Sequence, residues 1–241
     1  MRYICLMRML SVILLAFIAL SLTAKTNDEP MLHYIVRAPL IKSDKPPLII
    51  LMHGIGSNEN DLFSFAGQLP GKFLVVSLRG PYTLGPDSYA WYQADFSKGE
   101  PIINKEQAEK SRNAIIHFID QLKTKEQFDE KQVYLCGFSQ GAIMSFSVGL
   151  THPDKIKGIA VMSGRILDEV KPMITPTTQL KHLEVFISHG TKDKVIDVHY
   201  ARKAAAYLNE LGITGTYKEY DDVHTINKDM LADLVSWFGK R

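Results

Sequence analysis

The chain has 241 residues, of which 46% are hydrophobic and 22% are charged, and its formal net charge is +2. These proportions are ordinary for a globular domain and exclude a fibrous, disordered or multi-spanning membrane protein. No basic cluster marks a nucleic-acid surface, and a chain of this length can bury a core without disulfides or metals.

The first 24 residues have the layout of a secretory signal peptide. Arg2 and Arg8 precede an uncharged run over residues 9–23, with small residues at Ser21 and Ala24. The run is shorter than the ~20 apolar residues that a spanning helix needs, which favours cleavage near Ser21 or Ala24 over an uncleaved anchor. Loss of both arginines would lower the net charge from +2 to 0 (2 − 2).

Residues 30–241 contain no repeat or linker, and we expect them to form one domain. Continuous apolar runs bounded by proline or glycine are typical of strands buried on both faces of a parallel sheet. The chain has five: PPLIILMHG (46–54), KFLVVSLRGP (72–81), QVYLCG (132–137), IKGIAVMSG (156–164) and LEVFISHG (183–190). Residues 31–40 predict an edge strand, and residues 216–222 predict a last strand.

Amphipathic helices are predicted between these strands. Residues 104–126 place four apolar side chains on one face, with Asn104 as N-cap: Ala108, Ile115, Ile119 and Leu122. Further helices are expected after Gly141 and over about 198–211.

A last helix is expected from about residue 227, with Leu231, Leu234, Val235 and Phe238 on one face. Strands alternating with helices predict an α/β fold, a mostly parallel central sheet with helices on both faces. Its working site should lie at the carboxyl ends of the strands.

A serine between two glycines joins a predicted strand to a predicted helix in GFSQG (137–141). Gly137 and Gly141 would allow the tight turn and the close strand–helix packing that project Ser139 as a nucleophile. The string is short enough to arise by chance, so the interpretation depends on a base, an acid and an oxyanion hole elsewhere.

The base should follow the nucleophile and the acid in the chain order Ser, Asp, His. Five histidines follow Ser139: His152, His182, His189, His199 and His224. Only His224 falls in a loop between the last strand and the last helix, so it is the predicted base. His189 ends a strand, and we expect it to pack or hydrogen-bond locally.

Two carboxylates follow the strand that ends at Gly190. Asp193 comes directly after it, where it could reach a histidine ring nitrogen, whereas Asp197 suits the start of the next helix. Asp193 is therefore the predicted acid, and Asp197 is the alternative. The role of Asp193 would be to orient the imidazole of the base and to stabilise the imidazolium.

The oxyanion hole is predicted from backbone amides. One would belong to Gln140, which follows the nucleophile, and the other to Ile55 in the loop HGIGS, where Gly54 and Gly56 free the backbone. His53 is expected to brace this loop.

The aromatic-rich stretch 81–96, with Trp91 and Tyr92, is a candidate wall of the substrate pocket. The opposing interpretation is a satellite core.

Taken together, the motifs resemble those of the phospholipase/carboxylesterase family of α/β-hydrolases, which includes the acyl-protein thioesterases. The resemblance covers residue 46 to the end and follows LMHGIGSNENDL (51–62), RGPYTLGPDSYAWY (79–92), GFSQGA (137–142), MSG (162–164), HGTKDKVI (189–196) and YDDVHTIN (220–227). It implies an α/β-hydrolase fold without a large cap domain, a triad of Ser139, Asp193 and His224, and an oxyanion hole of Ile55 and Gln140.

The sequence thus predicts an exported serine esterase that forms an acyl-enzyme, with a small-molecule, lipid or sugar ester as substrate and with no metal or organic cofactor. Export, to the periplasm or the medium, would keep it from palmitoylated cytosolic proteins. Alternatives are an acetyl or feruloyl esterase of cell-wall polysaccharides, a serine peptidase and a non-catalytic binding module of the same fold. No nucleic-acid partner is expected, and the membrane is expected only during export.

Overall fold

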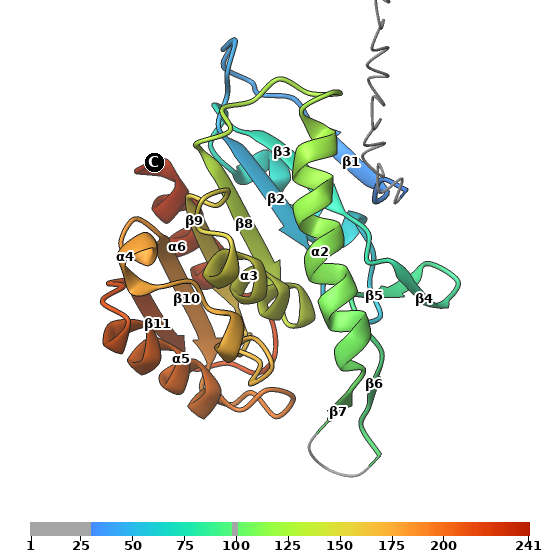
Figure 1. Cartoon of the computed structure of the whole chain (residues 1–241), viewed down its shortest axis with the longest axis vertical. Coiled ribbons are helices and arrows are strands. Elements are labelled where there is room, and N and C mark those ends of the chain that lie inside the picture. The colour runs from blue at the N-terminus through green and yellow to red at the C-terminus, as the bar shows by residue number, and fades with distance from the viewer. Residues whose placement is uncertain (1–29, 98–100) are drawn as a thin grey trace, which may run out of the picture.

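A computed structural model describes residues 30–97 and 101–241, so the predicted signal peptide lies outside the described residues. Their centre is a seven-stranded sheet in the order β1-β3-β2-β8-β9-β10-β11 (Figure 1). Its strands are β1 Tyr34–Arg37, β2 Leu48–Met52, β3 Leu74–Leu78, β8 Val133–Phe138, β9 Gly158–Met162, β10 Glu184–Gly190 and β11 Thr216–Tyr220. β1 is antiparallel to β3, and all other neighbours are parallel.

Helices cover both faces of this sheet. They are α1 Asn60–Phe63, α2 Lys105–Leu122, α3 Gln140–Thr151, α4 Thr177–Leu180, α5 Val198–Glu210 and α6 Lys228–Gly239, with short 3₁₀ turns at Ala66–Gln68 and Lys171–Met173. In Figure 1, α2, α3 and α5 lie in front of the sheet and α6 lies behind it. Apolar side chains of α1 and α6 share one core cluster, and those of α2, α3 and α5 share the other.

Strand β2 shows why the central strands are apolar along their whole length. Leu48, Ile50 and Met52 enter the core beneath α2 and α3, whereas Ile49 and Leu51 enter the core beneath α1 and α6. Every residue of β2 is buried, because a parallel strand with helices on both faces has no solvent face. The fold class predicted from the sequence is therefore confirmed.

The helix predictions hold with one correction. Asn104 caps α2 by accepting a hydrogen bond from the Gln107 amide, and the four predicted apolar residues of α2 are buried. In α6 the buried face is rotated from the predicted one: Leu231 and Val235 are half-buried, while Met230 and Trp237 are buried beside Leu234 and Phe238. The rotation brings Trp237 against aromatic rings of β8 and β10.

The described segments that extend beyond the carboxyl edge of the central sheet are small. Two two-stranded hairpins, β4 Tyr82–Gly85 with β5 Ser88–Ala90 and β6 Ala94–Asp95 with β7 Ile102–Ile103, project beside α2 (Figure 1). The described residues build no larger cap over the sheet. In this part of the chain, no helix has the length and apolar character needed to cross a membrane.

Two glycines allow the start of α3 to pack directly on the sheet. A Cβ at Gly141 would lie 2.0 Å from the carbonyl oxygen of Met52 in β2, and a Cβ at Gly137 would lie 2.2 Å from the backbone of Gly141. Real Cβ atoms do not approach other atoms so closely, so both positions require glycine. The close strand–helix packing that the sequence predicts for this pair is present, and Gly141 in addition brings α3 against β2.

Gly141→Ala should destabilise the fold by about 3 kcal/mol or more, because its methyl group would meet backbone that cannot move aside. The midpoint of urea denaturation measures this effect. Gly67→Ala is the matched control, since nothing lies within 4 Å of a Cβ there. Equal midpoints for the two variants would contradict the packing argument.

Candidate active site

Three predicted site residues, far apart in the chain, meet at the carboxyl edge of the sheet. Ser139 lies between β8 and α3, Asp193 follows β10, and His224 lies in the loop between β11 and α6. β8 and β10 flank β9, and β11 is the neighbour of β10, so their carboxyl ends open onto the same side. Parallel pairing thus brings together side chains that are up to 85 residues apart.

Ser139 occupies a strained backbone conformation. Its φ is +52° and its ψ is −115°, which a residue with a Cβ rarely adopts. The close contact of Gly137 and Gly141 holds the turn in this form, and the Ser139 amide donates to the Met162 carbonyl of β9 at 2.9 Å. The hydroxyl is thereby displayed above the edge of the sheet, at the N-terminus of α3, where the helix dipole favours negative charge.

A chain of hydrogen bonds links the three side chains. Ser139 Oγ lies 2.9 Å from His224 Nε2, and His224 Nδ1 lies 2.6 Å from Asp193 Oδ2. A carboxylate can only accept, so His224 carries its proton on Nδ1 and leaves Nε2 free to accept from the serine hydroxyl. The imidazole also lies against the Phe138 ring, with centroids 4.8 Å apart.

Asp193 is buried and richly hydrogen-bonded. Its Oδ1 accepts the amides of Val195 and Ile196 at 2.8 and 2.9 Å. Burial alone would raise the pKa of the Asp193 carboxyl, but hydrogen bonds from His189, His224 and the Ile196 amide together lower it well below its usual range. The carboxylate is therefore ionised at neutral pH.

His189 is a second histidine against this carboxylate, and the sequence does not reveal it. Its ring is fully buried, and Nε2 lies 2.6 Å from the Ile196 carbonyl and 3.2 Å from Asp193 Oδ2. Since the carbonyl requires a donor, Nε2 carries the proton and the second contact adds positive potential to Asp193. The predicted local hydrogen bond is present, but the contact with Asp193 depends on the turn after β10.

Asp197, the alternative acid, has a different place. It is the N-cap of α5, and its carboxylate accepts the His199 amide at 2.8 Å. Its partners are local and exposed, so it does not join the chain that includes Ser139.

The loop that contains Ile55 is held by a buried histidine. His53 Nε2 accepts the Gly80 amide at 2.9 Å, so its proton is on Nδ1, which donates to the Gly54 carbonyl at 2.7 Å. Burial lowers the pKa of His53, which favours this neutral form. Gly56, with φ +83°, turns the loop back. Neither the Ile55 nor the Gln140 amide donates to an acceptor within the described residues.

The side chain of Gln140 has a structural role that the sequence does not reveal, apart from the role predicted for its amide. Its Oε1 accepts the Trp91 amide and its Nε2 donates to the Tyr92 carbonyl, both at 2.7 Å. The first turn of α3 is thus tied to the segment after β5. A shorter or apolar side chain at this position would leave two buried backbone groups unpaired.

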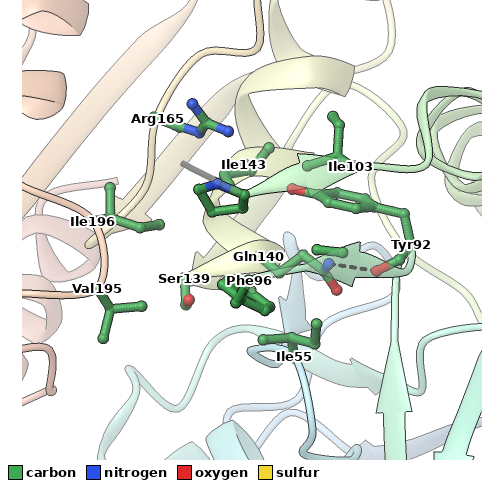
Figure 2. A pocket seen from close by; sticks show the side chains of 12 residues that line it. Ile55, Tyr92, Phe96, Ile103, Ser139, Gln140, Ile143, Arg165, Val195 and Ile196 are labelled. Atoms are coloured by element: carbon green, nitrogen blue, oxygen red, sulfur yellow. Dashed lines mark hydrogen bonds between the residues drawn. The ribbon is translucent and has the colours of Figure 1, made fainter. Parts of the chain in front are cut away.

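Trp91 does not line the pocket, which corrects its predicted place. Its side chain is fully buried, and its Nε1 donates to the His53 carbonyl at 3.0 Å. Tyr92 does line the pocket (Figure 2). Successive residues of this segment face opposite ways, so Trp91 braces the Ile55 loop and Tyr92 faces the pocket.

A pocket that is open to solvent lies beside Ser139, and the empty space in it and at its mouth together is about 420 Å³. Its walls are mainly apolar and come from segments that are far apart in the chain (Figure 2). They include Ile55, Tyr92, Phe96, Ile103, Ile143, Val195 and Ile196, with Arg165 at one side. No group of three or more His, Cys, Asp or Glu side chains in residues 30–97 and 101–241 is arranged to hold a metal ion.

Comparison with known proteins agrees with this fold. The sequence model of the Phospholipase/Carboxylesterase family matches residues 38–240. The chain therefore belongs to this family of α/β-hydrolases, whose members hydrolyse carboxylic esters.

Individual relatives are distant. Carboxylesterase SOBER1 of Arabidopsis thaliana is 27% identical over 156 residues, which are 63% of this chain and 68% of that protein. Acyl-protein thioesterase 1 of Emericella nidulans is 28% identical over 217 residues, or 80% and 89% of the two chains. The carboxylesterase structure from Bacillus cereus matches with a TM-score of 0.75 at 21% identity, covering 88% of this chain and 95% of that one, and shares the fold.

The lowered pKa of Asp193 predicts a particular acid dependence of stability. The ionised carboxylate stabilises the fold at all pH values above about 3.9, the usual Asp value, and this stabilisation is lost as the pH falls through the lower folded value. Asp193→Asn should therefore cost about 3 kcal/mol at pH 7, and the difference from the unsubstituted protein should narrow only below about pH 4.

Urea denaturation from pH 7 to pH 3 measures this difference. Asp197→Asn is the matched control, because asparagine caps a helix about as well as aspartate does. A difference for Asp193→Asn that widens towards acid pH would contradict the direction of the shift.

Proposed function

We propose that this chain is a serine carboxylesterase in which Ser139 is the nucleophile, His224 the general base and Asp193 the orienting acid. The observation that carries the proposal is the hydrogen-bond chain from Asp193 through His224 to Ser139, at 2.6 and 2.9 Å, beside an apolar pocket. Membership of a family of ester hydrolases supports the same chemistry.

In the first half-reaction, Ser139 Oγ attacks the ester carbonyl carbon while its proton passes to His224 Nε2. The carbonyl π electrons move to oxygen and form a tetrahedral oxyanion. On collapse, the bond from the carbonyl carbon to the alcohol oxygen breaks, and His224 returns the proton to that leaving oxygen. Asp193 stabilises the imidazolium throughout and keeps its own charge.

In the second half-reaction, water takes the place of the alcohol. His224 Nε2 accepts a proton from the water as its oxygen attacks the acyl carbon. The bond to Ser139 Oγ then breaks, His224 reprotonates the serine, and the acid is released. Every proton enters and leaves through the one nitrogen that the Nδ1–Asp193 hydrogen bond leaves free.

The amides of Ile55 and Gln140 form the proposed oxyanion hole. Both residues border the pocket with Ser139 (Figure 2), and neither amide is used by the described chain. Each such donor contributes about 3–4 kcal/mol of transition-state stabilisation. His53 and the Gln140 side chain hold the two donors in place before the substrate arrives, so little reorganisation is needed during the reaction.

Ser139→Ala should lower kcat for p-nitrophenyl butyrate by about 10⁶-fold, because the three side chains act as a unit. Ser236→Ala, on the exposed side of α6, is the matched control and should retain activity. Asp193→Asn should lower kcat by about 10⁴-fold through loss of the correct tautomer, while Asp197→Asn stays near the unsubstituted rate.

A fluorophosphonate probe separates the enzyme from a binding module of the same fold. The folded protein should be labelled at Ser139, and Ser139→Ala should not be labelled. Absence of labelling in the folded, unsubstituted protein would favour a non-catalytic role.

Export is the second part of the proposal and is supported by the basic, apolar and small-residue pattern of the first 24 residues. The full chain, expressed in a secreting host, should appear outside the cytosol with a new N-terminus just after Ser21 or Ala24, as read by intact mass. Leu14→Arg places a charge in the apolar run and should block export. A cytosolic protein with an unprocessed N-terminus would refute this part alone.

A further inference from the structure

The pocket beside Ser139 contains one charged side chain among its described walls, that of Arg165. In Figure 2 the guanidinium stands on the far side of the pocket from Ile55 and Ser139, and Ile143 lies nearby. Arg165 makes no hydrogen bond to Ser139, His224 or Asp193 in the described chain, so it is not part of the hydrogen-bond chain described above.

Arg165 has no anionic partner in the described chain. Asp168 and Glu169 follow it closely in sequence, but Lys171 holds the first at 2.7 Å and Lys105 holds the second at 2.7 Å. The contact of the guanidinium with the chain is cation–π, with its carbon 5.2 Å from the centroid of the Tyr200 ring. This contact orients the group. Asp168 is near enough for Arg165 to help lower the pKa of its carboxyl, but its ion pair is with Lys171, so the guanidinium forms no ion pair of its own in the described chain.

The backbone before Arg165 fixes its position. After β9, Ser163 adopts a φ of +53°, and its amide donates to the Ser188 carbonyl at 2.9 Å. Gly164 then packs on α3 so closely that a Cβ there would lie 2.6 Å from the Ala142 Cβ. This strained, close-packed turn delivers Arg165 to the pocket, beside the first turn of α3.

A half-buried cation in an apolar wall is unfavourable unless an anion can pair with it. The same low-polarity walls strengthen the attraction to any anion that enters, and a guanidinium fits the two oxygens of a carboxylate. We infer that the substrate is an anionic ester, whose carboxylate is bound by Arg165 while its reacting carbonyl lies at Ser139. This inference rests on the proposed esterase function and adds to it the class of ester.

The far end of the pocket is not closed. Arg165 also lines a neighbouring open groove, whose other charged residues are Lys171 and Lys203 and the carboxylates Asp168 and Glu210. A substrate can therefore place its carboxylate at Arg165 and continue into solvent beyond it. The ester and the acid are several bonds apart in such a substrate, because the pocket wall between them includes Ile143 and Tyr92.

Matched esters test this specificity. For an acid in the acyl part, mono-p-nitrophenyl adipate is compared with p-nitrophenyl hexanoate, which has the same number of acyl carbons. For an acid in the alcohol part, the acetate ester of 4-hydroxybutyrate is compared with butyl acetate. The readout is the ratio of kcat/KM for the anionic ester to kcat/KM for the neutral ester.

Arg165→Gln should lower this ratio by about 10- to 100-fold in at least one of the two pairs, and the affected pair identifies the part of the substrate that carries the acid. Arg165→Lys keeps the charge without the planar fork and should lose less. Lys131→Gln, the matched control, removes an exposed cation just before β8, at the opposite edge of the sheet from the pocket, and should change the ratio by less than about 3-fold.

An unchanged ratio in both pairs for Arg165→Gln would overturn the inference, provided that circular dichroism shows the variant folded. Failure of the esterase proposal has a different signature, which is no hydrolysis of any of the four esters or full activity of Ser139→Ala.

Discussion

The close contact between the first turn of α3 and the strands beneath it is the constraint on which the rest of the site depends. Gly141 brings the α3 backbone against the Met52 carbonyl, and Gly137 brings β8 against Gly141. The chain between them has room only for a turn in which Ser139 takes a positive φ. One packing distance therefore sets the direction of the hydroxyl, the exposure of the Gln140 amide and the start of the helix whose dipole favours an oxyanion.

Hydrogen bonds extend this constraint to the other parts of the site. The Gln140 side chain ties α3 to the backbone of Trp91 and Tyr92, and the Trp91 indole in turn holds the His53 carbonyl. His53 braces the loop that carries Ile55. The turn at Ser139, the Ile55 loop and the Tyr92 wall thus form one connected unit, and a change in any of them would disturb the others.

The sequence predicts the parts of the structure that depend on local pattern and chain order. Continuous apolar runs identify the buried strands. The choice of Ser139, Asp193 and His224 as partners follows from their order in the chain and from the position of each one after a predicted strand. The direction in which a side chain points is harder to predict where contacts with distant segments decide it. The local sequence does not show that Trp91 is buried while Tyr92 lines the pocket, or that the His189 side chain lies against Asp193. The α6 face was misplaced for the same reason, because aromatic partners on β8 and β10 decide its rotation.

The residues around the pocket differ in how they are held in place. Ser139 and Gln140 are fixed by backbone contacts with the sheet, so substitution there disturbs packing and chemistry together. Arg165 has its own close-packed turn, and its guanidinium lies against the Tyr200 ring and lines the pocket without joining an ion pair of the described chain. A different side chain at 165 can therefore alter the charge of the pocket without moving the hydrogen-bond chain from Asp193 to Ser139. On the proposed function, the groups that react with the ester are therefore separate from the cation proposed to select it, and this separation allows the ratio between matched esters to report on Arg165 without loss of the hydrogen-bond chain.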